Sequence, residues 1–321
     1  MRSPLLTFSI ALGYAECARI LGLFPHTGRS HQMVFEPLLK ALANRGHEVT
    51  VASFFPLKNP PLNYTDISFE GIASIGIETV DLTDYENPPL WMRVPLLDRL
   101  FRQIDDFHPL ADMALETCRK AVDWPPLIDA LKKDYDVVLV ENFNSDCMIA
   151  LLHVYDIKAP VISLLSSNLL AWSAERMGVS DNPAFVPSFG TMYQHPMTFW
   201  ERLENVFVEL CYKLWFRNMV QIKEQSVVEG RYGKIPDLGS LARNVSLMLV
   251  NTHHTLHGRK ALPPGIVEVG GMHLDPVRKY IPQVIAPASR VSPYKRSFSA
   301  ASFTVNSLQE THTHPKILLI T

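Results

Sequence analysis

The sequence predicts an α/β fold, built as a Rossmann-like, doubly wound and mostly parallel sheet. An apolar strand at residues 19–25 runs into a polar loop, a helical segment and another strand at residues 48–53. Strand, helix and strand in so few residues indicate parallel pairing through a right-handed crossover. A later strand at residues 136–141 is almost continuously apolar, as expected when both faces of a sheet are covered.

The first helix is expected at residues 32–44, after a loop at residues 25–30. Pro37 complicates it, because proline either kinks a helix or moves its regular start, here to about residue 36. Gly46 is expected to end the helix. The spacing of four apolar residues on one face supports the helix: Val34, Leu38, Ala41 and Leu42.

The second half of the chain repeats this alternation. Ser145 is the expected cap of a helix that runs to Tyr155. Segments rich in Pro, Asn and Ser are expected as loops at residues 59–66 and 179–190. Three more strands are expected, at residues 160–165, 245–251 and 266–270.

The longest helix is expected to start at Thr198. Thr198 and Glu201 have the spacing of a capping box, and apolar residues from Leu203 to Trp215 follow at helical spacing. Core packing is the default explanation of this apolar and aromatic helix. The alternatives are contact with a membrane surface or the lining of an apolar substrate cavity.

Composition limits the class of protein. The 321 residues have a formal net charge of -2, so no broad basic field indicates a nucleic-acid partner. Three cysteines remain after Cys17, and an odd number at scattered spacing predicts buried free thiols rather than a disulfide framework or a zinc site: Cys118, Cys147 and Cys211.

Three regions are expected: a signal peptide at residues 1–17, one domain at 18–274 and a divergent tail at 275–321, with a strand at 316–320. Arg2, an apolar stretch and small residues are typical of a secretory signal. The sequons at Asn63 and Asn244 fit the endoplasmic reticulum lumen or the secretory pathway. No run of about 20 apolar residues follows the signal, so no membrane span is expected.

Five segments in order resemble the UDP-glycosyltransferase family, and its insect branch in particular. They lie within residues 19–274, at 30–51, 141–147, 181–183, 196–202 and 249–271, the last spanning a pair of short motifs. The resemblance implies the N-terminal, acceptor-binding half of a GT-B fold, with two Rossmann-like domains facing across a cleft. The family's C-terminal donor motif, with its His-Gly-Gly core, and its membrane helix are not found in this sequence. A truncated, alternatively spliced or mis-assembled product is therefore expected.

The resemblance implies that His31 is the catalytic base, since an alcohol needs a base before it attacks and imidazole suits this near neutral pH. A carboxylate on the far ring nitrogen would fix the tautomer. Asp146 is the favoured carboxylate, and Glu141 follows it closely. His26 is the competing histidine, expected as a solvated loop residue. Asn251 and His253 are weaker candidates for residues that line the cleft.

The implied reaction is inverting transfer of a hexosyl group, glucose by the insect resemblance, from a UDP-sugar to a hydroxyl of a small lipophilic acceptor. No metal and no cofactor besides the UDP-sugar are implied. A dinucleotide site is not expected, because the first loop lacks the Gly-x-Gly-x-x-Gly spacing. The alternative is a truncated, non-catalytic product that binds lipophilic molecules or associates with full-length transferases. An esterase is disfavoured by the lack of a Gly-x-Ser-x-Gly elbow.

Overall fold

The computed structural model describes residues 17–75, 95–179, 182–184, 186–188, 191, 193, 196–257 and 262–274, with the backbone alone for 95–106. The helices and strands below all belong to one unit, Met1–Met272. Apart from residue 17, the predicted signal peptide lies outside the described residues. The predicted tail at residues 275–321, including its strand, lies outside them too.

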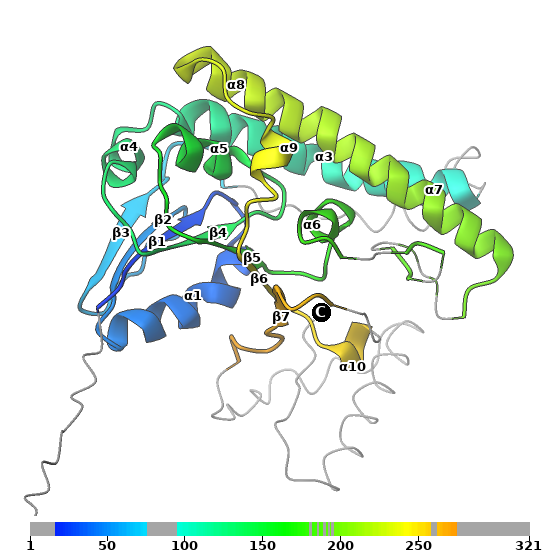
Figure 1. Cartoon of the computed structure of the whole chain (residues 1–321), viewed down its shortest axis with the longest axis horizontal. Coiled ribbons are helices and arrows are strands. Elements are labelled where there is room, and N and C mark those ends of the chain that lie inside the picture. Colours follow the sequence, from blue (N-terminus) through cyan, green and yellow to red (C-terminus); the bar gives the residue numbers. More distant parts are fainter. Residues whose placement is uncertain are drawn as a thin grey trace, which may run out of the picture. The chain divides into compact units, whose positions relative to one another are not determined.

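The described strands form one seven-stranded sheet in which every neighbouring pair is parallel (Figure 1). The order is β3-β2-β1-β4-β5-β6-β7, which confirms the predicted α/β, mostly parallel sheet. The strands are β1 (Arg19–Phe24), β2 (Glu48–Ser53), β3 (Tyr64–Ser68), β4 (Val137–Glu141), β5 (Val161–Leu165), β6 (Leu247–Val250) and β7 (Ile266–Glu268).

The strand order reverses between β1 and β4. After β1 the chain adds β2 and β3 on one side, and it then returns to add β4 on the other side. Gly22 of β1 pairs with Leu139 of β4, so these strands end side by side at the carboxyl edge of the sheet. Such a reversal point is where open parallel sheets form their ligand crevice.

Helices cover both faces of the sheet. α1 (Arg29–Asn44) lies on one face, and α3 (Pro95–Ala121), α4 (Pro125–Leu131) and α5 (Cys147–Val154) lie on the other (Figure 1). This double coverage explains why β4 reads as a continuous apolar run. The shorter helices are α6 (Ala171–Arg176), α9 (Leu238–Leu241) and α10 (His254–His257).

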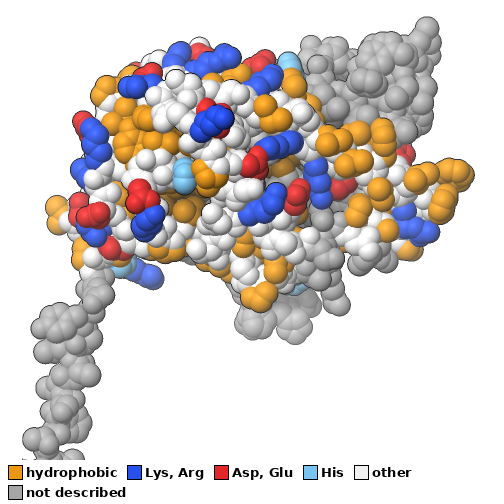
Figure 2. Space-filling view, turned by 45° about the horizontal axis from the view of Figure 1, so that its top comes forward, with side chains coloured by type: hydrophobic (Ala, Val, Ile, Leu, Met, Phe, Trp, Pro, Cys, Tyr) orange, Lys and Arg blue, Asp and Glu red, His pale blue; other side chains and the backbone are white. Residues whose placement is uncertain are grey.

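One long continuous helix packs against the outer side of α3 and α5. It consists of α7 (Phe199–Phe216), the π-helical turn η2 (Arg217–Gln221) and α8 (Ile222–Tyr232). The predicted capping box is confirmed: Glu201 N–H donates to Thr198 Oγ1, and Thr198 N–H donates to Glu201 Oε2 at 2.6 Å. Part of the surface along α7 is apolar, on the right of Figure 2.

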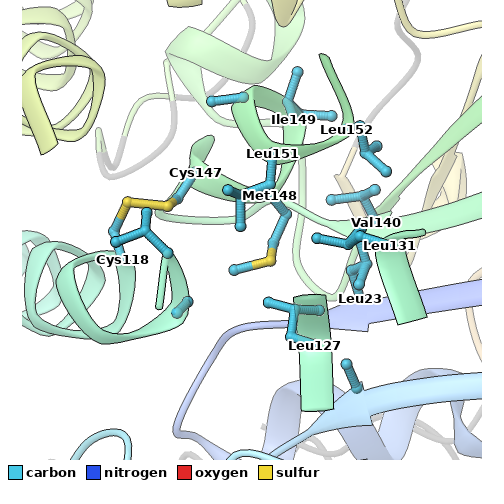
Figure 3. Close-up of a cluster of buried hydrophobic side chains, with 14 of the residues drawn as sticks. Leu23, Cys118, Leu127, Leu131, Val140, Cys147, Met148, Ile149, Leu151 and Leu152 are labelled. Carbon is cyan, nitrogen blue, oxygen red and sulfur yellow. A yellow bond between two sulfur atoms is a disulfide. The ribbon is translucent and has the colours of Figure 1, made fainter. Parts of the chain in front are cut away.

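The core between the sheet and α4, α5, α8 and α9 is a cluster of buried apolar side chains (Figure 3). Leu23 of β1, Val140 of β4 and Met148 of α5 are at most 1% exposed. A second cluster, with Phe35 and Leu39 of α1, fills the opposite face. Burial on both faces makes the sheet a rigid platform for the loops at its carboxyl edge.

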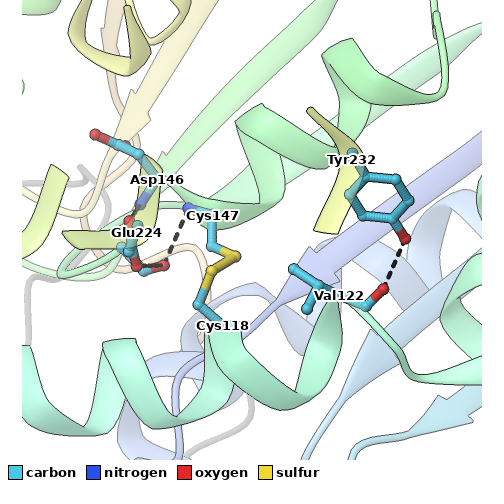
Figure 4. Close-up of a disulfide and its surroundings, with 7 residues drawn as sticks. Cys118, Val122, Asp146, Cys147, Glu224 and Tyr232 are labelled. Carbon is cyan, nitrogen blue, oxygen red and sulfur yellow. Dashed lines mark hydrogen bonds between the residues drawn. A yellow bond between two sulfur atoms is a disulfide. The ribbon is translucent and has the colours of Figure 1, made fainter. Parts of the chain in front are cut away.

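A disulfide joins Cys118 of α3 to Cys147, the first residue of α5 (Figure 4). The prediction of buried free thiols is therefore wrong for these two cysteines, whereas Cys211 is free, as predicted, but only half-buried. Spacing along the chain could not reveal the pair, because a 29-residue separation brings them together only through helix packing. A bond that closes a loop of this length contributes about 3 kcal/mol to stability.

Several element boundaries differ from the predictions. α1 starts at Arg29, three residues before the expected position, and Pro37 lies inside it. β3 begins at Tyr64, inside a segment expected to be a loop. The helix after β4 has Asp146 at its N-cap without a side-chain cap bond, although Ser145 Oγ accepts from Cys147 N–H. Among the described residues, no helix is both long and apolar enough to cross a membrane.

Candidate active site

His31 lies in the first turn of α1, just after β1, and Gly28 is the N-cap of that helix. Its backbone N–H donates to Gly28 O at 3.1 Å. The loop that connects strand and helix is short, so the imidazole stays at the carboxyl edge of the sheet beside the end of β4. The side chain is 17% exposed, which leaves it reachable by a small molecule.

Glu141 is the last residue of β4, and its carboxylate meets this imidazole. His31 Nδ1 lies 2.9 Å from Glu141 Oε1 and 2.7 Å from Ser166 Oγ, the residue directly after β5. Within the described part of the chain, both hydrogen bonds of the imidazole are made at Nδ1. A hydrogen on Nδ1 that faces these two oxygens leaves Nε2 as the nitrogen able to take a proton.

The two oxygens of the Glu141 carboxylate differ in their hydrogen bonding. It is 1% exposed, and its Oε2 atom has no hydrogen-bond partner among the described residues. Its Oε1 atom contacts the imidazole. The contact with His31 is therefore the only hydrogen bond of this carboxylate among the described residues.

His26 is buried rather than solvated, so that expectation is wrong. Its ring stacks on the His31 ring at a centroid distance of 3.7 Å, and Phe143 meets both rings edge-on. Burial, and to a lesser extent the neighbouring His31, lowers the pKa of His26 to about 2. His26 Nδ1 accepts from Gly28 N–H at 2.8 Å. A neutral ring of this kind packs against the base and is a poor base itself.

Gly28 permits this stacking. A Cβ atom at this position would lie 2.8 Å from His26 Cε1 and 3.5 Å from His31 Cδ2. The first distance is shorter than a normal contact, so any larger residue would displace the His26 ring. The glycine is therefore required by close approach rather than by an unusual backbone angle, since its φ is -81°.

Asp146 does not contact His31. Its Oδ2 accepts from Arg176 Nη2 at 2.7 Å and from Gln221 Nε2 at 2.9 Å, and its Oδ1 accepts weakly from Asn142 Nδ2 at 3.5 Å. Asp146 is fully buried, and Arg176 is 7% exposed. Of the two predicted carboxylates, the structure brings Glu141 to the imidazole and places the favoured Asp146 in a separate polar cluster.

Glu224 of α8 completes this second cluster. Its carboxyl group accepts from Ser145 Oγ at 2.6 Å and from Asp146 N–H at 2.8 Å (Figure 4). Burial, and secondly the negative charge of Asp146, raise the pKa of Glu224 to about 8. One buried guanidinium can neutralise one of the two acids, so the other keeps its proton at neutral pH.

The two weaker candidates, Asn251 and His253, differ in what they contact. Asn251 Nδ2 donates to Ser166 O at 2.8 Å, so Asn251 supports the residue that contacts His31. His253 Nδ1 instead lies 2.7 Å from Thr255 Oγ1. Sequence reasoning missed Ser166, although it had the same signal as Glu141: a polar residue at the end of an apolar strand next to the reversal point.

A hollow of about 380 Å³ opens next to the loop that carries His26. It is within the size range of small-molecule sites. Its described lining mixes apolar and polar side chains: Thr27, Ser74, His108, Pro109, Asp112, Met113 and Glu116. The expectation that α7 lines an apolar cavity is not supported by this hollow, because no α7 residue is among these. The described residues contain no group of three or more His, Cys, Asp or Glu side chains that could hold a metal ion.

Comparisons with known proteins identify relatives over most of the chain. UDP-glucosyltransferase 2 of Dactylopius coccus is 27% identical over 97% of this chain and 57% of its own length. UDP-glycosyltransferase UGT5 of the same insect is 30% identical over 84% of this chain and 50% of its own length. The glycosyltransferase of kitacinnamycin, a solved structure, matches with 14% identity and a TM-score of 0.39 over 79% of this chain and 51% of its own.

The chain spans about half the length of the curated relatives it matches. The family model described as "UDP-glucoronosyl and UDP-glucosyl transferase" matches residues 21–288, which is most of the chain and includes His31 of α1 and Glu141 of β4. The chain therefore belongs to the UDP-glucuronosyl and UDP-glucosyl transferase family.

Proposed function

We propose that this chain is the acceptor-binding half of a UDP-glycosyltransferase, with His31 as the base and Glu141 as its carboxylate partner. The observation that carries the proposal is the 2.9 Å contact between His31 Nδ1 and Glu141 Oε1, which leaves Nε2 as the ring nitrogen that can take a proton. This geometry matches the requirement for removing a proton from a hydroxyl group.

The proposed reaction is inverting transfer of a hexosyl group, glucose in particular, to a small lipophilic molecule that carries a hydroxyl. His31 Nε2 takes the hydroxyl proton while the acceptor oxygen bonds to the anomeric carbon. The bond from that carbon to the diphosphate oxygen breaks on the opposite side, and UDP leaves with the electron pair. Glu141 holds the Nδ1 hydrogen and stabilises the imidazolium that forms. The names of the insect relatives support a UDP-sugar as co-substrate.

The secretory pathway is the proposed location. A buried disulfide persists in oxidising compartments and is rare in the cytosol. Asn63 and Asn244, the asparagines of the two sequons, are both exposed and so accessible for glycosylation. A mass measurement before and after glycosidase treatment of the secreted chain tests this.

The activity is tested on this chain joined to the donor half of UDP-glucosyltransferase 2. We expect His31→Ala to lower UDP-glucose-dependent transfer by roughly 10²- to 10⁴-fold, the usual contribution of a positioned base. Acceptor affinity, measured by calorimetry, should stay close to that of the parent. His153→Ala is the matched control, because His153 is exposed on α5. Normal turnover in His31→Ala would remove His31 from the mechanism.

A further inference from the structure

α7 presents an unusual outer surface. Every residue of α7 that is exposed is apolar, with exposed fractions between 42% and 73%: Phe199, Trp200, Leu203, Val206, Phe207, Leu210 and Leu214. We call these seven side chains the apolar face of α7. A surface helix normally turns its polar side to water. A contiguous apolar face on a monomer therefore indicates a surface that is covered by something else.

The spacing of this face matches a helix–helix seam. Phe199, Leu203, Val206 and Leu210 follow one another at intervals of four, three and four residues. That is the interval of a coiled-coil stripe, in which two helices pack at a shallow angle. A single partner helix running along α7 would cover the stripe along its length.

The same face is complementary to itself. An antiparallel copy of α7, related by a twofold axis between Val206 and Phe207, places these two residues opposite each other. It also places Leu203 opposite Leu210, and Phe199 opposite Leu214. Such a self-matching patch is the requirement for a symmetric dimer. Trp200, the seventh residue, falls opposite Lys213, and an ammonium group is attracted to an indole ring.

The size of the face agrees with this partner. Seven large side chains that are each about half exposed present on the order of 600 Å² of apolar area. A standard interface buries about 800 Å² per partner, so the face with its polar border is close to that size. The border residues have both signs of charge, including Glu204 and Arg202, whereas helices that lie on anionic lipid have borders rich in Lys and Arg.

We propose that the apolar face of α7 is the interface of an antiparallel homodimer. A second copy of this chain is the occupant that the spacing, the twofold match and the area all favour. The proposal does not depend on the catalytic roles of His31 and Glu141, because those residues lie on other elements.

Pairwise cross-linking tests the register in the full chain, in a Cys17→Ser, Cys211→Ser background. Leu203→Cys protein and Leu210→Cys protein should each give little cross-linked dimer under mild oxidation. Their mixture should give a strong dimer band on a non-reducing gel. Ser226→Cys, an exposed position on α8, is the control and should not cross-link in any mixture. Equal cross-linking of Ser226→Cys would contradict the proposed seam.

Sedimentation velocity provides the second readout. The parent should sediment with twice the monomer mass that mass spectrometry gives for the same preparation. Leu203→Glu and Leu210→Lys should each weaken the dimer at least tenfold. The double variant should recover it, because each glutamate then faces a lysine of the other copy. Circular dichroism melting checks that these variants fold, as expected for exposed positions. A parent that stays monomeric, or that sediments with phosphatidylcholine vesicles through this face instead, would overturn the proposal.

Discussion

Glu141 and Asp146 are buried carboxylates of the same connection, yet their surroundings differ in one respect that decides what each can do. Asp146 receives hydrogen bonds on both oxygens and has Arg176 beside it. Glu141 contacts the His31 imidazole through one oxygen, and its other oxygen has no partner among the described residues. A buried carboxylate with hydrogen bonds on both oxygens and a guanidinium beside it stabilises the fold. A buried carboxylate with one unpartnered oxygen can instead stabilise a positive charge that forms on its neighbour during a reaction.

The largest expected effect comes from breaking each carboxylate in turn. Asp146→Asn removes the carboxylate that Arg176 Nη2 contacts and leaves the Glu224 carboxyl group to offset the guanidinium by losing its proton, so we expect the free energy of unfolding to fall by at most about 3–5 kcal/mol. Glu141→Gln should leave that free energy nearly unchanged and should lower transfer in the fused enzyme on the order of 10²-fold. Urea unfolding and initial rates separate the two. Equal loss of stability in both variants would erase the distinction between the two sites.

The disulfide lies next to the Asp146 cluster, because Cys147 follows Asp146 directly, and its contribution to stability can be measured by removing it. Replacing both Cys118 and Cys147 by alanine should lower the free energy of unfolding by about 3 kcal/mol, through the greater freedom of the unfolded chain. Calorimetric melting measures this loss. Cys211→Ala is the control, because that thiol is free, and it should melt close to the parent.

Glu224 makes the buried cluster sensitive to pH. In the unfolded chain this carboxyl group loses its proton near the ordinary glutamate pKa of 4.5, whereas in the folded protein it keeps the proton up to a pKa of about 8. The folded state binds more protons between these values, so the contribution of Glu224 to stability is complete below pH 4.5 and is lost as the pH rises through 8.

Glu224→Gln should remove this dependence. The parent should lose up to about 1.4 kcal/mol of unfolding free energy per pH unit from this group between about pH 5 and pH 8, and the variant should show a flatter profile. Urea titrations at several pH values measure the difference. Asp129→Asn, an exposed acid on α4, should keep the slope of the parent. A parallel pair of profiles for Glu224→Gln and the parent would show that Glu224 does not titrate in this range.

The smallest expected effect concerns Ser166. Ser166→Ala removes one of the two oxygens at His31 Nδ1 and leaves Glu141 in place. We expect a loss of about 1 kcal/mol of transition-state stabilisation, which is a few-fold in kcat/KM, and a displaced pH–rate profile. Ser167→Ala is the neighbouring control, because its hydroxyl donates to Asn168 O instead. An identical pH–rate profile in Ser166→Ala and the parent would limit Ser166 to a structural role.

Local patterns predicted most of the sheet. β1, β2, β4 and β5 lie within two residues of their predicted bounds, because a buried parallel strand has a recognisable apolar run. The capping box at Thr198 was predictable for the same reason, since its bonds span three residues. β3 was missed because Tyr64–Ser68 mixes polar and apolar residues and has no continuous apolar run. It lies at the edge of the sheet and forms a strand by pairing with β2.

Long-range contacts were not predictable in this way. The choice between Glu141 and Asp146 depends on Arg176 and Gln221, which reach Asp146 from 30 and 75 residues away. The disulfide depends likewise on how α3 packs against α5. A strand end shows that a polar residue reaches the crevice, but the pairing of side chains there follows from tertiary packing.

The π-helical turn between α7 and α8 acts as a one-residue insertion in the helix register. The inward positions of α7 include Asn205, Tyr212 and Phe216, and an uninterrupted α-helix would continue this line to Lys223. A π turn accommodates one additional residue, which rotates the following helix by about 100°. Glu224 therefore takes the buried position, whereas Lys223 is only half-buried. The one additional residue of the π turn thus places Glu224, rather than Lys223, in the interior, although the rest of the helix keeps its ordinary geometry.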